Sequence, residues 1–439
     1  MRCCATIKEV NILQIHVIQS GDSLYRLSQA YGIPIEVIAE ANEIVPTNTL
    51  VIGQALVIPI VGQYYWVQPG DSLFLIAQRF GISVRTLVSV NQLSANSPLV
   101  TGTRLYIPPK PKRDAEIIAY IEPRGDTVSP ALTQAAREAA PLLTYLAPSS
   151  FRINRDGTLQ PPLLDDFGTI ADENGVILMM VITNLENEQF SEEIGHLILN
   201  DEAIQNRLLD EIIRTAKQLH FRDIHFDLEH ISPDDKEAYN QFLRKAVHLI
   251  HQEGMQMSTA LAPKTSAAQT GPWYSAHDYK AHGEIADFVV IMTYEWGYSG
   301  GPPMAVSPIG PVRDVLEYAI SEMPASKIMM GQNLYGYDWT LPYVPGGPYA
   351  RAISPQRAIE LARTNNAAIQ YDATAQAPFF HYWTGGKEHV VWFEDARSIQ
   401  AKFNLLKELG LRGVSYWKLG LSFPQNWLLI EDNFHVVKR

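Results

Sequence analysis

The sequence predicts an α/β protein in which a (β/α)8 TIM barrel is preceded by two small β-α-α-β repeats. Two observations predict this architecture. After residue 114, apolar runs alternate with helical stretches, and before residue 110 a set of short motifs returns at a constant offset of 49 residues. Apolar strands that alternate with helices indicate a parallel sheet covered by helices on both faces. A chain of 439 residues is long enough for both parts.

The amino-terminal repeat has no gaps across four separate anchors. Gly21-Asp22-Ser23-Leu24 returns as Gly70-Asp71-Ser72-Leu73. Asn42, Gly53 and Ile58-Pro59 return as Asn91, Gly102 and Ile107-Pro108. A constant offset over several anchors indicates two copies of one structural unit.

Each copy predicts a strand, two helices and a closing strand. Asp22 or Asp71 is expected to cap the first helix. Gly32 and Gly81 suit the left-handed end of that helix. Apolar residues at helical spacing are interpreted as one buried face. These residues are Leu24, Leu27 and Tyr31 in the first copy and Leu73, Ile76, Ala77 and Phe80 in the second.

The two copies, over residues 15–60 and 64–108, resemble the LysM module in their Gly-Asp-Ser-Leu turn, late Asn and closing Gly-x-x-Leu-x-Ile-Pro. The resemblance implies binding of peptidoglycan or chitin through the turn before the first helix and the loop before the last strand. The alternative for Asp22 and Asp71 is a capping role alone. The net charge of residues 15–108 is -1, so salt should affect such binding little. The implied glycan contacts are Gly21, Asp22, Ser23, Leu24, Gly70, Asp71, Ser72 and Leu73.

Composition excludes several classes of partner. The formal net charge is -12, from 35 Lys and Arg against 47 Asp and Glu, so we expect neither nucleic acid nor a membrane as a partner. Cys3 and Cys4 are the only cysteines, which leaves no disulfide framework. The histidines lack metal-ligand spacing, so we expect no metal and no cofactor. Residues 1–14 lack the long apolar core and cleavage site of a signal peptide.

A Pro- and Lys-rich linker at 109–114 leads into the predicted barrel, residues 115–437. This span exceeds the ~250 residues typical of the fold, and an insertion near 336–396 would account for the excess. The predicted strands are Ile117–Tyr120, Leu142–Tyr145, Val176–Val181, Ile224–Glu229, Met257–Leu261, Phe288–Tyr294, Ile328–Met330 and Gly413–Trp417.

The fourth predicted strand carries a pair of carboxylates. Side chains alternate along a strand, so His225, Asp227 and Glu229 should share one side. Two close carboxylates repel as anions, which favours one protonated group and makes it a candidate general acid. An isolated pair of this kind is more often structural. Barrel enzymes, however, place their chemistry at the carboxyl ends of the strands, where Tyr294 and Trp417 also fall.

Four motifs then resemble glycoside hydrolase family 18: His-Phe-Asp-Leu-Glu at 225–229, Met-Thr-Tyr-Glu-Trp at 292–296, Gly-Gln-Asn-Leu-Tyr at 331–335 and Val-Ser-Tyr-Trp at 414–417. The resemblance implies substrate assistance, in which the 2-acetamido oxygen attacks its own anomeric carbon. Glu229 would act as acid and base, Asp227 would orient the acetamido group, and Tyr294 would bond its carbonyl. Substrate contacts are assigned to His225, Met292, Gln332, Trp417, Trp296 and Asn184.

The chain departs from the common family pattern Asp-Gly-x-Asp-x-Asp-x-Glu. Arg222 and Asp223 replace the first Asp and Gly, His225 replaces the middle Asp, and Glu295 follows Tyr294 where Asp is usual. A histidine at the middle position suggests a group that titrates near neutrality. We hypothesise that His225 hydrogen-bonds Asp227 and alters the pH dependence. The alternative is an interior histidine with other partners.

Two LysM modules before such a barrel resemble the spore cortex-lytic N-acetylglucosaminidases of Bacillus. That resemblance implies a monomer that hydrolyses β-1,4 bonds of cortex peptidoglycan, or of its fragments, during germination with retained configuration. It also implies synthesis in the mother cell and a place in the cortex or coat region of the spore. A chitinase and a catalytically silent glycan-binding protein of the spore layers remain alternatives.

Overall fold

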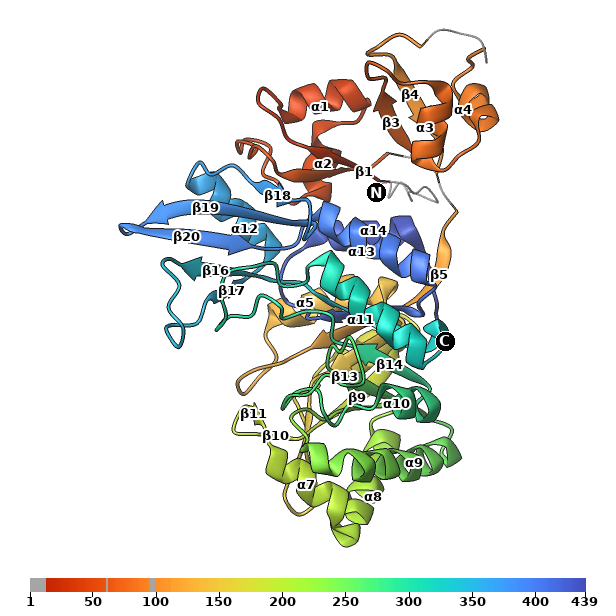
Figure 1. The fold of residues 1–439 in the computed structure, drawn as a ribbon, viewed down its shortest axis with the longest axis vertical. Helices are drawn as coiled ribbons and strands as arrows, with labels where there is room; N and C mark the ends of the chain where they lie inside the picture. Colours follow the sequence, from red (N-terminus) through yellow and green to blue (C-terminus); the bar gives the residue numbers. More distant parts are fainter. Residues whose placement is uncertain (1–12, 61, 95–98, 110) are drawn as a thin grey trace, which may run out of the picture.

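The computed structural model describes residues 13–60, 62–94, 99–109 and 111–439. Cys3, Cys4 and the rest of the segment up to residue 12 lie outside the described residues, as does Lys110 of the predicted linker. Two small modules lie at one end of the molecule, above a barrel from which a second sheet projects sideways (Figure 1).

The two modules have the predicted β-α-α-β order. In each, the two strands pair antiparallel, and Gly32 and Gly81 end the first helix with φ of 73° and 65°. The Asn42 side chain donates to Ile38 O and to Val57 O, each at 2.8 Å. These two bonds join the second helix to the closing strand, which explains the Asn that occurs late in the repeat. The elements are β1 (Gln14–Val17), α1 (Leu24–Tyr31), α2 (Ile35–Ala41) and β2 (Ala55–Ile58), then β3 (Gln63–Trp66), α3 (Leu73–Phe80), α4 (Val84–Val90) and β4 (Arg104–Ile107).

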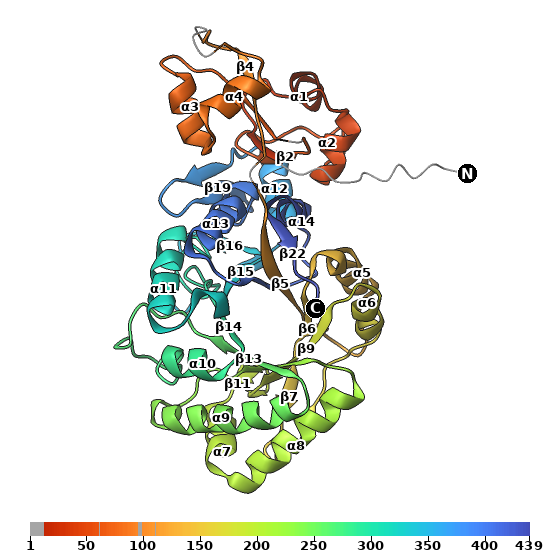
Figure 2. The same ribbon diagram turned by 90° about the vertical axis from the view of Figure 1, so that its right-hand side faces the viewer.

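Eight parallel strands close into a barrel, which confirms the predicted fold class. Figure 2 shows these strands as a ring with helices outside it. Around the ring the strands are β5 (Arg113–Ile121), β6 (Tyr145–Pro148), β9 (Ile177–Thr183), β12 (Asp223–Asp227), β13 (Gln256–Leu261), β14 (Phe288–Ile291), β15 (Ile328–Asn333) and β21 (Gly413–Trp417).

Several strand boundaries differ from the prediction; the sixth strand, for example, ends at Ile291 rather than at Tyr294. The second strand begins at Tyr145, because the chain before it forms a 3-10 turn at Ala140–Leu142 that directly continues the preceding helix. The fourth ends at Asp227, so Glu229 lies in the loop that follows. β5 begins at Arg113, inside the predicted linker, because β22 (Phe434–Val436) pairs with its start.

Helices cover the outside of the barrel and bury the outward apolar face of each strand in one large core. They are α5 (Pro130–Ala139), α6 (Phe167–Glu173), α7 (Glu192–Asn200), α8 (Glu202–Gln218), α9 (Lys236–Gln252), α10 (Tyr279–Ile285), α11 (Ile309–Glu322), α13 (Ala396–Leu409) and α14 (Pro424–Asn433), with 3-10 turns η1 (Ala140–Leu142), η2 (Pro233–Asp235) and η3 (Ala325–Lys327). Short strands β7 (Phe151–Ile153), β8 (Leu159–Gln160), β10 (Leu185–Glu186) and β11 (Gln189–Phe190) lie in the loops.

A five-stranded antiparallel sheet is inserted between β15 and α13, in the order β17-β16-β20-β19-β18. It projects from the barrel beside the first module (Figure 1). The insertion contains β16 (Gly336–Thr340), β17 (Arg351–Ile353), α12 (Pro355–Thr364), β18 (Gln370–Asp372), β19 (Ala377–Thr384) and β20 (Lys387–Trp392).

Within the described residues, no single helix is long and apolar enough to cross a membrane; α3 and α4 meet the length and composition limits only as a pair bent by 102°.

Candidate active site

The side chains of strand β12 alternate between the outer and the inner side of the barrel, as predicted. Ile224 and Phe226 pack in the core between barrel and helices, which leaves His225 and Asp227 on the inner side. The inner side also carries an apolar cluster that includes Met179, Val181 and Phe288. Asp227 and Glu229 are partly buried where this interior opens at the carboxyl end of the barrel.

The surroundings of the two carboxyl groups favour their protonated forms. Burial raises the pKa of Glu229 well above its usual range, the charge of Asp227 adds to this, and a hydrogen bond from the Trp273 indole N–H opposes it. Burial also raises the pKa of Asp227. Within the described residues, Asp227 Oδ1 is buried without a hydrogen-bond partner. A protonated Glu229 is the state that a general acid requires.

Asn184 positions Glu229. Its Nδ2 donates to Glu229 O at 2.8 Å, and its Oδ1 accepts from Glu229 N at 3.1 Å. Nδ2 also donates to Ser191 O at 2.9 Å. Both polar atoms of the Asn184 side chain are thus hydrogen-bonded to backbone groups of the protein. This geometry does not support the predicted contact between Asn184 and the sugar.

The expected hydrogen bond between His225 and Asp227 is wrong. His225 Nε2 lies 2.7 Å from Tyr120 Oη, and Nδ1 lies 2.8 Å from Ser258 Oγ, so both ring nitrogens have other partners. Ser258 in turn donates to Asp223 Oδ1 at 2.7 Å. Burial lowers the pKa of His225 to about 3, so the histidine is neutral near pH 7 and does not titrate there as expected.

Burial raises the pKa of Tyr294, and the nearby charges of Asp227 and Glu229 add to this rise. Tyr294 and Met292 belong to one buried cluster, against which Trp417 packs. The Trp417 ring also meets Tyr120 edge-on, with centroids 5.6 Å apart. A Cβ at Gly331 would lie 3.0 Å from the Tyr294 ring and 2.5 Å from Ile291 O, so this glycine makes room for Tyr294.

Two tyrosines hydrogen-bond to the Glu295 carboxylate, and the sequence did not predict these contacts. The Tyr335 hydroxyl donates to Glu295 Oε1, and Tyr337 Oη lies 3.1 Å from the same oxygen. Burial raises the pKa of Glu295, while these hydrogen bonds lower it. Glu295 is thus a third carboxylate next to Tyr294. Only its place after Tyr294 in the motif could have signalled this role.

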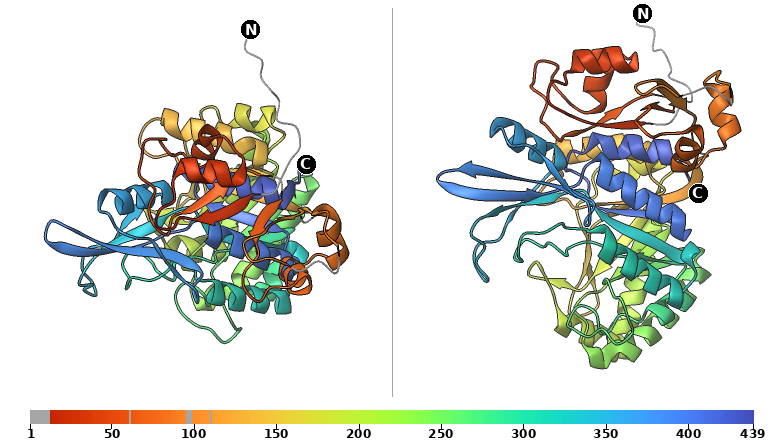
Figure 3. Two further views of the ribbon diagram at one scale, coloured as in Figure 1. Left: turned by 90° about the horizontal axis from the view of Figure 1, so that it is seen from above. Right: turned by 45° about the horizontal axis from the view of Figure 1, so that its top comes forward.

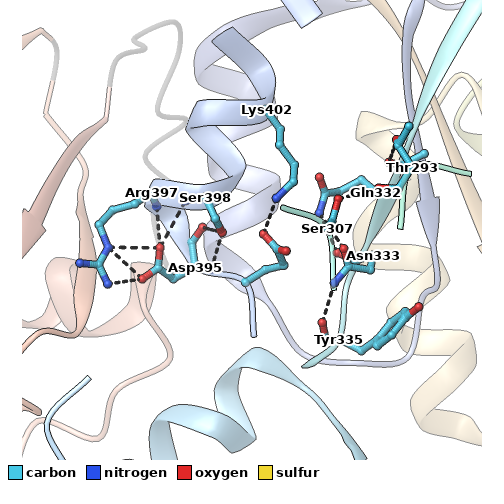
Figure 4. A network of polar contacts seen from close by, with 11 residues as sticks. Thr293, Ser307, Gln332, Asn333, Tyr335, Asp395, Arg397, Ser398 and Lys402 are labelled. Carbon is cyan, nitrogen blue, oxygen red and sulfur yellow. Dashed lines mark hydrogen bonds and ion pairs between the residues drawn. The ribbon is translucent and has the colours of Figure 1, made fainter. Parts of the chain in front are cut away.

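The two remaining predicted substrate contacts, Trp296 and Gln332, differ in whether a substrate can reach them. Trp296 lines a cavity of about 480 Å³ together with Trp273, Tyr294 and Glu295. Gln332 is fully buried, and its Nε2 donates to Asn333 O at 3.1 Å. Figure 4 shows Gln332 among polar neighbours that include Asn333 and Ser307. Gln332 lies two residues after Met330, which faces the helix layer, so a direct sugar contact is not supported.

In both Gly-Asp-Ser-Leu turns the Gly and the Ser are exposed, but the residue that caps the helix differs from the prediction. Ser23 and Ser72 cap the helices by accepting from Arg26 N and Leu75 N. Asp22 instead accepts from Gln19 N at 2.7 Å and closes the turn before the helix. Asp71 does the same with Gln68 N at 2.7 Å. Leu24 and Leu73 are buried in the two module cores, so only their backbone is available to a ligand.

Over the described part of the chain, no three His, Cys, Asp or Glu side chains lie close enough together to hold a metal ion.

A (β/α)8 barrel with two carboxyl groups at the carboxyl end of one strand has the fold and the groups of a glycoside hydrolase. The family description "Glycosyl hydrolases family 18" matches residues 116–421, and "LysM domain" matches residues 16–59 and 65–108. The chain belongs to glycosyl hydrolase family 18 and carries two LysM domains.

Its similarity to particular proteins covers almost the whole chain. It is 67% identical to the cortical fragment-lytic enzyme of Bacillus subtilis, over 97% of this chain and 99% of that protein. It is 54% identical to the enzyme of the same name from Bacillus anthracis, over 98% of this chain and all of that one. The crystal structure of the Bacillus megaterium spore cortex-lytic enzyme SleL superposes with a TM-score of 0.90 at 56% identity, over 98% of this chain and 100% of that chain.

Proposed function

We propose that this glycoside hydrolase is a retaining N-acetylglucosaminidase that cleaves β-1,4 bonds of spore cortex peptidoglycan, or of its fragments, during germination. The observation that carries this proposal is the Asp227–Glu229 pair at the end of β12, where burial and then the charge of Asp227 raise the pKa of Glu229. The names of the similar proteins, cortical fragment-lytic enzyme and spore cortex-lytic enzyme, support the cortex as substrate.

In the first step, Glu229 protonates the glycosidic oxygen, and the bond from that oxygen to the anomeric carbon breaks. The acetamido oxygen of the same sugar attacks the anomeric carbon from the opposite face and forms a cyclic oxazolinium ion. Asp227 accepts a hydrogen bond from the acetamido N–H, and Tyr294 donates one to the acetamido oxygen. A turn of the Asp227 carboxyl toward this N–H would give its buried Oδ1 the partner that it lacks.

In the second step, Glu229 takes a proton from water as the water oxygen bonds to the anomeric carbon. The bond to the acetamido oxygen breaks and the acetamido group is restored. Two displacements give retention of configuration. Trp417 lies at the carboxyl end of β21, where its ring suits the C–H face of the reacting sugar.

Charge favours cortex fragments over intact wall. Residues 1–114 carry a net charge of +2, which leaves -14 on residues 115–439 of a chain whose total is -12. An acidic barrel is repelled by an anionic polymer at low salt. Short fragments with few peptide side chains reduce this repulsion. We further propose that the protein acts as a monomer at the cortex or coat region of the spore, after synthesis in the mother cell.

Mass spectrometry of the products tests the proposal. Muramidase-trimmed cortex and, separately, chitin oligomers are incubated with the wild-type chain, Glu229→Gln and Glu253→Gln; the control Glu253 forms a surface ion pair with Lys217. We expect new reducing ends at N-acetylglucosamine in cortex from the wild type and the control, and a loss of at least ~10³-fold in rate for Glu229→Gln with glycan binding retained. Cleavage of chitin alone would identify a chitinase, and cleavage of neither would identify a glycan-binding spore protein.

A further inference from the structure

The two LysM modules differ in what surrounds the loop before their last strand. In the first module this loop is hydrogen-bonded to the catalytic domain. Ile369 N donates to Ile52 O at 2.9 Å, and Arg397 Nη2 donates to Gly53 O at 3.1 Å. One residue past the loop, Gln425 Nε2 donates to Ala55 O at 3.0 Å. The donors come from the insertion, α13 and α14, three separate parts of the barrel domain.

Apolar packing reinforces these hydrogen bonds. Val51 is 6% exposed and belongs to the same buried cluster as Ile353, Ile369 and Phe380 of the insertion. On the closing strand β2, Ala55 and Val57 belong to the core of the barrel itself. Figure 3 shows the first module seated over α13 and α14.

The same positions of the second module are open. Val100 corresponds to Val51 at the 49-residue offset and is 66% exposed. A Cβ on Gly53 would lie 1.8 Å from Ile369 O, whereas a Cβ on Gly102 would meet no atom of the described residues within 4 Å. The loop of the second module therefore has free space where the first meets the insertion.

The sequences of the two closing strands also differ, in accordance with this difference in burial. β2 reads Ala-Leu-Val-Ile and is buried on both faces, whereas β4 reads Arg-Leu-Tyr-Ile and is buried on one face. Arg104 and Tyr106 replace the two small apolar residues that contact the barrel. The turns before the first helices do not differ in this way, since Tyr25 and Phe74 just after them are 64% and 65% exposed.

We propose that the two modules divide the work. The first is an intramolecular adaptor, whose loop before the last strand is occupied by the catalytic domain. The second holds the glycan, a neutral stretch of β-1,4-linked N-acetylglucosamine-type sugar, between its turn at 68–73 and its loop at 99–103. This inference rests on the glycan binding that the two LysM domains imply.

Hydrogen exchange with mass spectrometry tests the inference on the full chain carrying Glu229→Gln, so that ligand is not consumed. Chitohexaose and, separately, purified cortex fragments are added to distinguish the two sources of the same sugar chemistry. We expect residues 49–55 to be protected before ligand is added and unchanged afterwards, and residues 99–103 to gain protection. Ligand-dependent protection at 49–53, or at neither loop, would overturn the division of work.

Matched substitutions add a second readout. Thr101 corresponds to Ile52, whose side chain is 52% exposed, and both are changed to Glu in the full chain. Chitin is uncharged, so the new carboxylate acts by occupying the loop rather than by repulsion. We expect Thr101→Glu to weaken binding to chitin about tenfold, which corresponds to ~1.4 kcal/mol, and Ile52→Glu to change it less than about twofold.

Equal losses in the two variants, or a loss in Ile52→Glu alone, would refute the inference. Their melting temperatures, which should match that of the parent, separate lost binding from lost folding. If the parent chain bound neither chitohexaose nor cortex fragments anywhere, the proposed glycan-binding function itself would fail. Protection confined to the barrel would overturn only the role of the second module.

Discussion

At the scale of the residue, the interior of the barrel is organised by a histidine that does not titrate. His225 connects Tyr120 to Ser258 and, through Ser258, to Asp223. A neutral His225 ring can make both of these hydrogen bonds. Burial instead raises the pKa of Asp223 to about 8, so the carboxyl at the outer end of the network is the group that titrates near neutral pH.

The substitution Asp223→Asn should stabilise the protein relative to the wild type, and this gain in the free energy of unfolding should grow as pH rises. The folded pKa of Asp223 lies above its unfolded value, so the stability that the carboxyl contributes is full below about pH 4 and is lost as pH rises through about 8. Asparagine can still accept from Ser258 and has no such loss. We expect Tm to rise at pH 8 by about 2–4 °C for each kcal/mol gained, with little gain at pH 4.5. A difference in Tm that stays constant from pH 4.5 to 8 would contradict this.

Trp273→Phe should move the pH dependence of catalysis. The indole N–H donates to Glu229 and stabilises its ionised form, so removing this donor raises the pKa of the general acid. Activity falls as the acid ionises, and the basic limb of kcat/KM should therefore shift to higher pH by roughly one unit. The pH-rate profile measures this shift. Trp383→Phe, at a tryptophan that is 67% exposed, is the matched control and should leave the profile unchanged.

At the scale of the element, a buried ion pair ties the inserted sheet to α13. Lys402 Nζ lies 2.9 Å from Glu394 Oε2, and both side chains are 1% exposed. Asp395 caps α13 through Arg397 N and Ser398 N, and the Arg397 guanidinium bonds Asp395 in turn (Figure 4). The point where the chain leaves the insertion and resumes the barrel is thus fixed by charge as well as by packing.

Lys402→Met should cost about 3–5 kcal/mol of unfolding free energy, because it leaves Glu394 buried without its partner. Adding Glu394→Met replaces both charges with apolar groups and should restore most of the loss. Urea unfolding of the two variants and the wild type measures these differences. A double variant no more stable than Lys402→Met would argue against the ion pair as the cause.

At the scale of the whole molecule, the two homologous modules should differ in stability although they share a fold. Each module has a small core of its own, but the first also buries Val51, Ala55 and Val57 against the barrel domain, whereas the core of the second consists of seven buried residues alone. A core of that size stabilises a small domain only marginally. The first module should therefore open only when the barrel domain opens.

Hydrogen exchange of the ligand-free chain checks this expectation. The amides of Leu105 and Ile107 on β4 should exchange faster than those of Leu56 and Ile58 at the same repeat positions on β2. We expect a difference of at least about tenfold in rate, because opening of the second module does not require exposure of the barrel core. Equal protection of the two strands would mean that the modules open together.

Local patterns in the sequence predicted much of the fold and part of the site. Alternating apolar runs predicted the barrel, a constant offset predicted the two modules, and the Asp-x-Glu motif predicted Asp227 and Glu229 at the end of one strand. The family resemblance then supplied the reaction. These signals are periodic or adjacent in the chain, so they survive without knowledge of contacts.

The hydrogen-bond partner of each polar side chain in the site could not be predicted in this way, because it depends on the fold. Asn184 holds the backbone of Glu229, and His225 bonds Tyr120 and Ser258 rather than Asp227. Each of these contacts joins residues more than 30 positions apart. The same holds for the two modules, whose sequences match at their anchors while one is built into the barrel and the other is left open. Side-chain pairing across a barrel depends on strand register and on burial, which no local pattern contains.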